Sequence, residues 1–116
     1  MKAEIDVFGT HYTVQELTVE QSPVKLADTE GYTELFSKEI VLRTGYEDSP
    51  STIKCVNDYK AKVLRHELMH AIFHECGLSN YCDDETLVEF LAIQFPKIQK
   101  ILGQVEEVYD TSTKNS

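Results

Sequence analysis

At 116 residues, the chain has room for one folded domain with a single modest core. Hydrophobic residues make up 41% and charged residues 27% of the chain, as in ordinary globular domains, and this excludes a largely disordered protein. The formal net charge of -9 disfavours nucleic acid as a partner, because most of the surface would repel a phosphate backbone.

The chain carries no signal for a membrane or for secretion. No apolar run approaches the roughly 20 residues of a membrane span, and the N-terminus M-K-A-E-I-D-V-F lacks the apolar core of a secretory signal. The cysteines Cys55, Cys76 and Cys82 are odd in number and have no C-x-x-C spacing, which argues against a disulfide framework and a zinc ribbon. We therefore expect a cytoplasmic, monomeric protein with reduced thiols and no membrane or nucleic-acid partner.

The first half of the chain has the pattern of β-strands. Apolar residues alternate with polar ones between Ile5 and Leu17, with a break at Gly9, and this predicts a hairpin of half-buried strands. Leu35 and Phe36 suit a turn or short strand after the break at Gly31, and residues 40–42 are the best core of a further strand. The simplest arrangement of these segments is an antiparallel sheet of three strands. The turn-forming residues 45–51 separate it from the second half of the chain.

The second half changes to helical periodicity. Apolar residues recur at helical spacing over residues 57–76, and Gly77 supplies a stop. A second helix is expected over residues 84–102, with Pro96 kinking or dividing it. The apolar pattern is lost after Gly103, so we expect one domain over residues 1–103 and a partly flexible tail over residues 104–116.

The motif H-E-L-M-H, from His66 to His70, lies within the first predicted helix. Its histidines are one helical turn apart, so both imidazoles can reach one metal ion from the same face, and Glu67 is close enough to act as a base on a water molecule. Metal-assisted hydrolysis requires these three groups. The alternative is a chance match on an amphipathic helix.

A catalytic zinc site needs a third protein ligand. His74 lies a further turn along the helix, and we predict that it is a neighbour rather than a ligand. Glu89, on the second predicted helix, interrupts an apolar stretch where a carboxylate without a partner would be unusual. Glu85 is the other candidate, but an acid in the first turn of a helix is already explained by the helix dipole. Glu89 is therefore the preferred third ligand.

This order of residues resembles the gluzincin class of zinc metallopeptidases, in which a glutamate on the next helix completes the site. H-E-L-M-H followed at this distance by V-E-F-L-A is similar to the minimal gluzincins and the ImmA/IrrE-type metallopeptidases, often encoded by phages and prophages. The resemblance covers residues 40–102. It implies an α+β, zincin-like fold, a Zn²⁺ ion on His66, His70 and Glu89, and Glu67 as the catalytic base.

The expected activity is selective hydrolysis of a peptide bond by a zinc-bound water, with Glu67 as general base. The substrate would be a protein or peptide, such as a phage or bacterial regulator, paired with an exposed strand edge at residues 40–43. Tyr59, Tyr81, Tyr109 or His74 could stabilise the oxyanion. The alternative to a frayed tail is that the residues beyond Gly103 fold over the cleft and supply a fourth zinc ligand. The alternative function is a zinc-binding regulatory protein with the same fold and little or no proteolytic activity.

Overall fold

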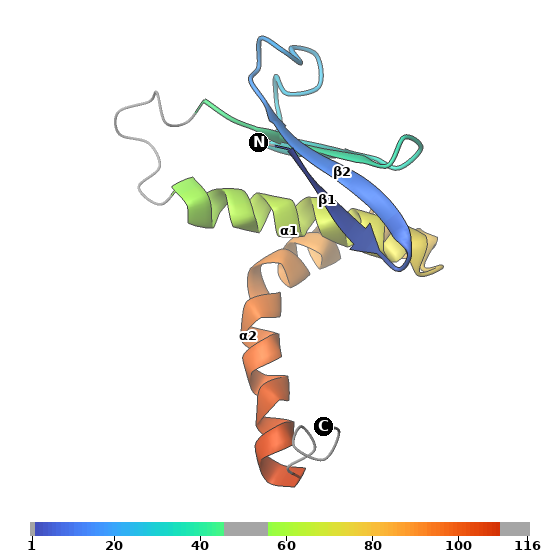
Figure 1. The fold of residues 1–116 in the computed structure, drawn as a ribbon, viewed down its shortest axis with the longest axis vertical. Coiled ribbons are helices and arrows are strands. Elements are labelled where there is room, and N and C mark those ends of the chain that lie inside the picture. The colour runs from blue at the N-terminus through green and yellow to red at the C-terminus, as the bar shows by residue number, and fades with distance from the viewer. Residues whose placement is uncertain (1, 46–55, 110–116) are drawn as a thin grey trace.

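The computed structural model describes residues 2–45 and 56–109. It has an α+β fold in which the first long helix packs against one mixed sheet and the second long helix packs against the first (Figure 1). The strands are β1 (Lys2–Val7), β2 (Thr10–Leu17), β3 (Gly31–Glu34) and β4 (Glu39–Arg43). The helices are α1 (Val56–Glu75), the short 3₁₀ helix η2 (Ser79–Tyr81) and α2 (Glu85–Tyr109). The described helices include none that is both long and apolar enough to cross a membrane.

The sheet differs from the predicted one in strand number and in direction. Its order is β1-β2-β4-β3, with β2 and β4 parallel and the other two neighbouring pairs antiparallel. The prediction of three antiparallel strands was therefore wrong. The β1–β2 hairpin was readable because its turn is local: Phe8 and Gly9 both have positive φ, as a tight two-residue turn requires. The β2–β4 pairing joins distant segments, and no periodicity in the sequence predicts it.

Helix α1 lies against one face of the sheet and closes the core. Tyr12 and Val14 of β2 and Ile40 and Leu42 of β4 are almost completely buried, and they belong to the same apolar cluster as Val63 of α1. Two of the predicted features are thus confirmed, namely the inward face of the hairpin and a helix at the H-E-x-x-H motif. Most of the loop predicted over residues 45–51 lies outside the described residues.

The C-terminal end of α1 is fixed to the sheet by the carboxylate of Glu75. It accepts hydrogen bonds from the hydroxyl of Tyr12 (2.6 Å), the hydroxyl of Thr10 (3.1 Å) and the ammonium group of Lys38 (2.7 Å). The hydrogen bonds from Lys38 and Tyr12 lower the pKa of Glu75 from 4.5 to about 2, although burial opposes them. The ionised carboxylate therefore stabilises the fold.

We predict that Glu75→Gln makes the free energy of unfolding less dependent on acid pH. A carboxyl group whose pKa is lower in the folded protein stabilises the fold above its unfolded pKa, and this contribution disappears as the pH falls from about 4.5 to about 2. At neutral pH the substitution should cost about 1 kcal/mol. Urea unfolding from neutral pH to about pH 3 measures both effects. Glu4→Gln, at an exposed carboxylate of β1, is the control, and equal slopes for wild type and Glu75→Gln would contradict the prediction.

Helix α2 is longer than predicted and remains one helix through Pro96. Because proline has no N–H, it cannot donate to the carbonyl of Ala92 one turn earlier. Arg65 of α1 supplies the missing hydrogen bond, since its Nε donates to the Ala92 oxygen at 2.7 Å. The helix is bent, with its first turns along α1 and the rest turned away (Figure 1). It also continues past Gly103, the predicted end, to Tyr109; residues 110–116 lie outside the described residues.

Candidate metal centre

The motif residues of α1 face a cavity of about 610 Å³. The cavity is bounded by the segment from Thr29 through β3, by α1, and by the first turn of α2 with the residues before it. His66, Glu67 and His70 all line it, as do Glu85 and Glu89 from α2. The helical spacing of the motif accounts for the two histidines and the candidate base at one cavity. The angle at which α2 packs on α1 brings the two carboxylates of α2 to the same cavity.

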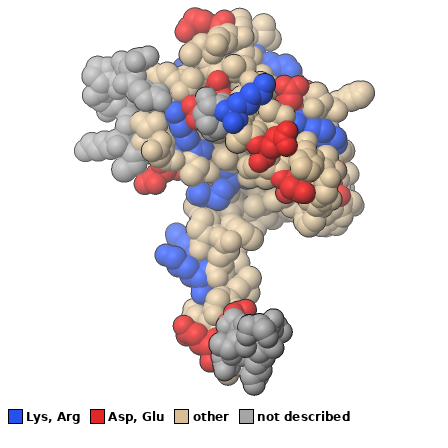
Figure 2. All heavy atoms as spheres, in the orientation of Figure 1, with Lys and Arg blue, Asp and Glu red and all other residues tan. Residues whose placement is uncertain are grey.

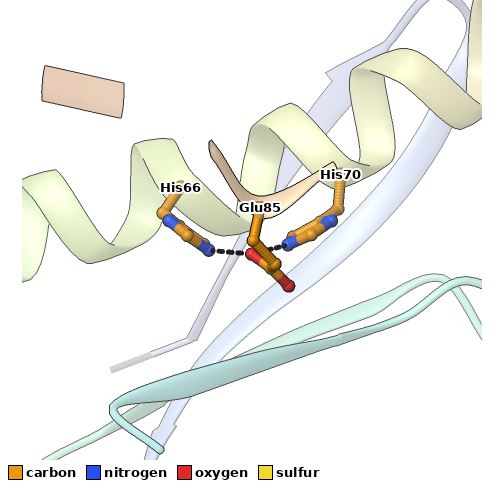
Figure 3. Close-up of side chains that lie close together, drawn as sticks. All are labelled: His66, His70 and Glu85. Atoms are coloured by element: carbon orange, nitrogen blue, oxygen red, sulfur yellow. Dashed lines mark hydrogen bonds and ion pairs between the residues drawn. The ribbon is translucent and has the colours of Figure 1, made fainter. Parts of the chain in front are cut away.

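The two histidines present their Nε2 atoms to one point, which Glu85 occupies (Figure 3). The Oε1 atom of Glu85 is 3.0 Å from Nε2 of His66 and 3.4 Å from Nε2 of His70. The two imidazole rings are inclined at 65° with centroids 5.2 Å apart, so they converge rather than stack. Three electron-rich atoms at this separation are stabilised by protons or by a cation between them.

Hydrogen bonds at the other ring nitrogens hold both imidazoles in this orientation. Nδ1 of His66 donates to Oε1 of Glu89 at 2.7 Å, and Nδ1 of His70 donates to the backbone oxygen of Cys82 at 2.5 Å. Lys62 donates to the second oxygen of Glu89 at 3.0 Å. A histidine whose Nδ1 donates in this way keeps the lone pair of Nε2 available for a metal ion.

In the structure Glu85, rather than the preferred Glu89, lies at the point where the two Nε2 atoms converge. Glu89, the predicted third ligand, contacts the Nδ1 side of His66, away from the point that the two Nε2 atoms share. Glu85, the alternative, reaches that point although its side chain is 68% exposed. The two carboxylates are one turn apart on the same side of α2, so the packing angle of the helices decides which one meets which nitrogen.

Glu67 is the one buried acidic side chain among the described residues, with 7% of its surface exposed. The hydroxyl of Thr33, on β3, lies 2.8 Å from its Oε1 and 3.0 Å from its backbone oxygen, so it can donate its proton to either. Burial raises the pKa of Glu67, although the Thr33 hydrogen bond and the nearby histidines oppose this. No pattern in the sequence points to Thr33, because a threonine in a short strand is ordinary.

The donor set fits a zinc ion. Two imidazole nitrogens and one carboxylate oxygen are the ligands of many catalytic zinc sites, and they leave a position open. The candidate donor atoms all lie within 4.8 Å of one another, as ligands of one ion must. A second group, His70, Cys82 and Asp83, has comparable spacing. There, however, the Cys82 thiol donates to the His70 backbone oxygen at 3.2 Å, and burial raises the pKa of this thiol.

Other residues singled out in the sequence divide between the cavity and the rest of the surface. Tyr59 lines the cavity, whereas His74 is half-buried and does not belong to its lining. Tyr81 packs near Phe73, with ring centroids 6.1 Å apart. Tyr109 is the last residue of α2, whose later turns run away from α1 and the sheet (Figure 1). The idea that the residues after Gly103 cover the cleft is therefore wrong as far as Tyr109.

The exposed strand edge at the cavity belongs to β3 rather than to residues 40–43. β4 lies between β2 and β3, so the prediction of an open edge there was wrong. In the described part of the chain β3 pairs only with β4, and Gly31 and Thr33 of β3 line the cavity. Because Glu30 and Arg43 share a ladder hydrogen bond, the alternation of an antiparallel pair leaves the backbone groups of Gly31 and Thr33 at the open edge.

Comparisons with protein-family models, curated proteins and solved structures found no match for this chain. The resemblance to gluzincins rests on the H-E-x-x-H residues and on Glu89 of the following helix.

Proposed function

We propose that the protein is a zinc-dependent metallopeptidase in which His66, His70 and Glu85 hold the ion and Glu67 is the general base. The observation that carries the proposal is the convergence of both Nε2 atoms on one carboxylate oxygen, with both Nδ1 atoms engaged in hydrogen bonds. A chance H-E-x-x-H match on a surface helix gives no reason for these four contacts to occur together. Glu89 and Lys62 would position His66 without binding the ion.

A zinc ion bound at these residues would polarise a carbonyl group and lower the pKa of water. The carboxylate of Glu67, adjacent to His66 and buried in the cavity wall, is placed to accept a proton from the attacking water and to pass it to the leaving amine. Thr33 holds this carboxylate by its hydrogen bond and so limits its rotation. The buried position of Glu67 excludes competing solvent from the base.

An extended peptide is the substrate that best suits the cavity. The open edge of β3 offers the N–H and C=O groups of Gly31 and Thr33, which can pair with the main chain of any sequence in an extended conformation. Thr33 also contacts Glu67, so a peptide paired with this edge would lie beside the base. We infer an endopeptidase that selects its target, a protein or peptide, through the side chains around this edge.

Zinc titration tests the metal site directly. We expect about one zinc ion per chain for the wild type after removal of metal by a chelator, and an affinity at least about a hundredfold lower when both His66 and His70 are replaced by alanine. His11→Ala and His74→Ala are matched controls, because these histidines lie outside the cavity lining. Calorimetry measures both quantities. Equal zinc affinity in the double variant and the controls would overturn the site.

A further inference from the structure

The last turns of α2, residues 97–109, form an arm that projects from the domain. Every residue from 101 to 109 is exposed, and the molecule measures 52 Å along its longest axis against 34 and 28 Å along the others. Figure 1 shows these turns standing away from the sheet and from α1. An isolated stretch of helix is marginally stable in water, so an arm of this length requires a further source of stabilisation.

The arm carries one continuous apolar stripe that nothing in the described chain covers. Its members are Ile101, Leu102, Val105, Val108 and Tyr109, which are between 49% and 72% exposed. Their spacing of one, three, three and one residues places them on one face of a helix. With Ile98 they also fit a heptad pattern, in which Ile98, Leu102, Val105 and Tyr109 are the seam positions. Such a stripe is typical of a helix that packs against another helix.

We propose that this arm pairs with the arm of a second copy of the chain in an antiparallel coiled coil. The residues flanking the seam set the orientation. On one flank are the apolar Ile101 and Val108, and on the other are the polar Gln99 and Glu106. In an antiparallel pair like flanks meet, so Ile101 packs against Val108 of the second copy. In a parallel pair Ile101 would meet Glu106 and leave a carboxylate against an apolar side chain.

The charges of the arm favour the same orientation. Lys97 and Lys100 lie near the domain, and Glu106 and Glu107 lie near the end of the helix. Figure 2 shows this separation, with basic side chains on the stem of the arm and acidic ones close to its tip. Antiparallel pairing brings the basic part of each arm beside the acidic part of the other and opposes the two helix dipoles. It also keeps the two bodies, each part of a chain of net charge -9, at opposite ends.

The two residues least suited to a helix lie off the seam. Pro96 and Gly103 fall at the same heptad position, on the side of α2 away from the stripe. A Cβ atom added at Gly103 would meet no atom within 4 Å, so this position has no contact to preserve. The helix therefore keeps its apolar face uninterrupted. A monomer was expected from the sequence, and the exposed stripe is the reason to propose a dimer instead.

Sedimentation velocity of the full chain, from low micromolar to near-millimolar concentration, tests the dimer. We expect a reversible monomer–dimer equilibrium that Leu102→Lys with Val105→Lys weakens by about tenfold or more. Ile93→Lys places one such positive charge on an exposed apolar residue of α2 away from the seam and should leave the equilibrium unchanged. Gly103→Ala, which favours the helix without touching the stripe, should strengthen the dimer several-fold. A wild type that is monomeric throughout, or an equal effect of both lysine variants, would overturn the proposal.

Disulfide cross-linking tests the orientation. In the antiparallel pair Leu102 of one copy faces Val105 of the other, so an equimolar mixture of Leu102→Cys and Val105→Cys should give mainly the mixed dimer on mild oxidation. The wild type, which keeps the exposed Cys76, is the background control. Separate homodimers of each variant would indicate a parallel pair and contradict the antiparallel arrangement. Neither experiment depends on zinc or on peptide hydrolysis, so the result is independent of the proposed activity.

Discussion

Glu67→Gln should abolish peptide hydrolysis and leave zinc affinity unchanged. The amide has nearly the shape of the carboxylate and can still accept the hydrogen bond from Thr33, but it cannot take a proton from water at neutral pH. Loss of a general base typically lowers the rate by about 10² to 10⁴. Cleavage of a library of unstructured fluorogenic peptides measures the rate, and calorimetry with zinc measures the affinity.

Glu75→Gln is the matched control for this variant, because it makes the same chemical change on the same helix. Glu75 accepts hydrogen bonds from the sheet and does not line the cavity. It should lose stability and keep its rate per folded molecule. A Glu67→Gln protein that hydrolyses peptides as fast as wild type would contradict the proposed role of the base. A wild type that binds zinc at His66 and His70 but cleaves no peptide would favour the alternative, a zinc-binding regulatory protein.

The features that the sequence predicted well are local ones. Helix α1 was expected over residues 57–76 and is found from Val56 to Glu75, because its apolar spacing and the stop at Gly77 depend only on neighbouring residues. Within that helix, the repeat of about 3.6 residues places His66 and His70 on the same face. The length of α2 was missed because Gly103 was interpreted as the end of the apolar pattern. A glycine costs a helix about 1 kcal/mol without ending it, and Val105, Val108 and Tyr109 continue the helical spacing.

The features that the sequence did not predict depend on packing between distant segments. The parallel pairing of β2 with β4 places β3 at the edge of the sheet, and this brings Thr33 to Glu67. No pattern within residues 31–34 indicates that contact. The positions of Glu85 and Glu89 were still harder to predict. The two residues are four apart, so the helical repeat places both on the same side of α2 and does not distinguish them. Only the angle at which α2 crosses α1 separates them.

Glutamine substitutions at these two positions should separate a ligand from a positioning residue. Glu85→Gln is expected to lower zinc affinity by about a hundredfold or more, because an amide oxygen is a poor zinc ligand and the position faces both Nε2 atoms. Glu89→Gln should reduce affinity by less than about tenfold, because the amide oxygen still accepts from Nδ1 of His66 and the half-exposed Lys62 can turn toward solvent. Competition with a chromogenic chelator at constant pH measures both affinities.

Glu89→Ala adds the test of the positioning role itself. Removing the acceptor leaves His66 free to rotate, and the loss of such a partner usually costs about 10- to 100-fold in metal affinity, which the glutamine variant should largely recover. A ligand would behave differently, since alanine and glutamine would be equally damaging. If Glu89→Gln lost zinc while Glu85→Gln retained it, Glu89 would be the third ligand, as the sequence alone had predicted, and α2 would have to shift along α1 when the ion binds.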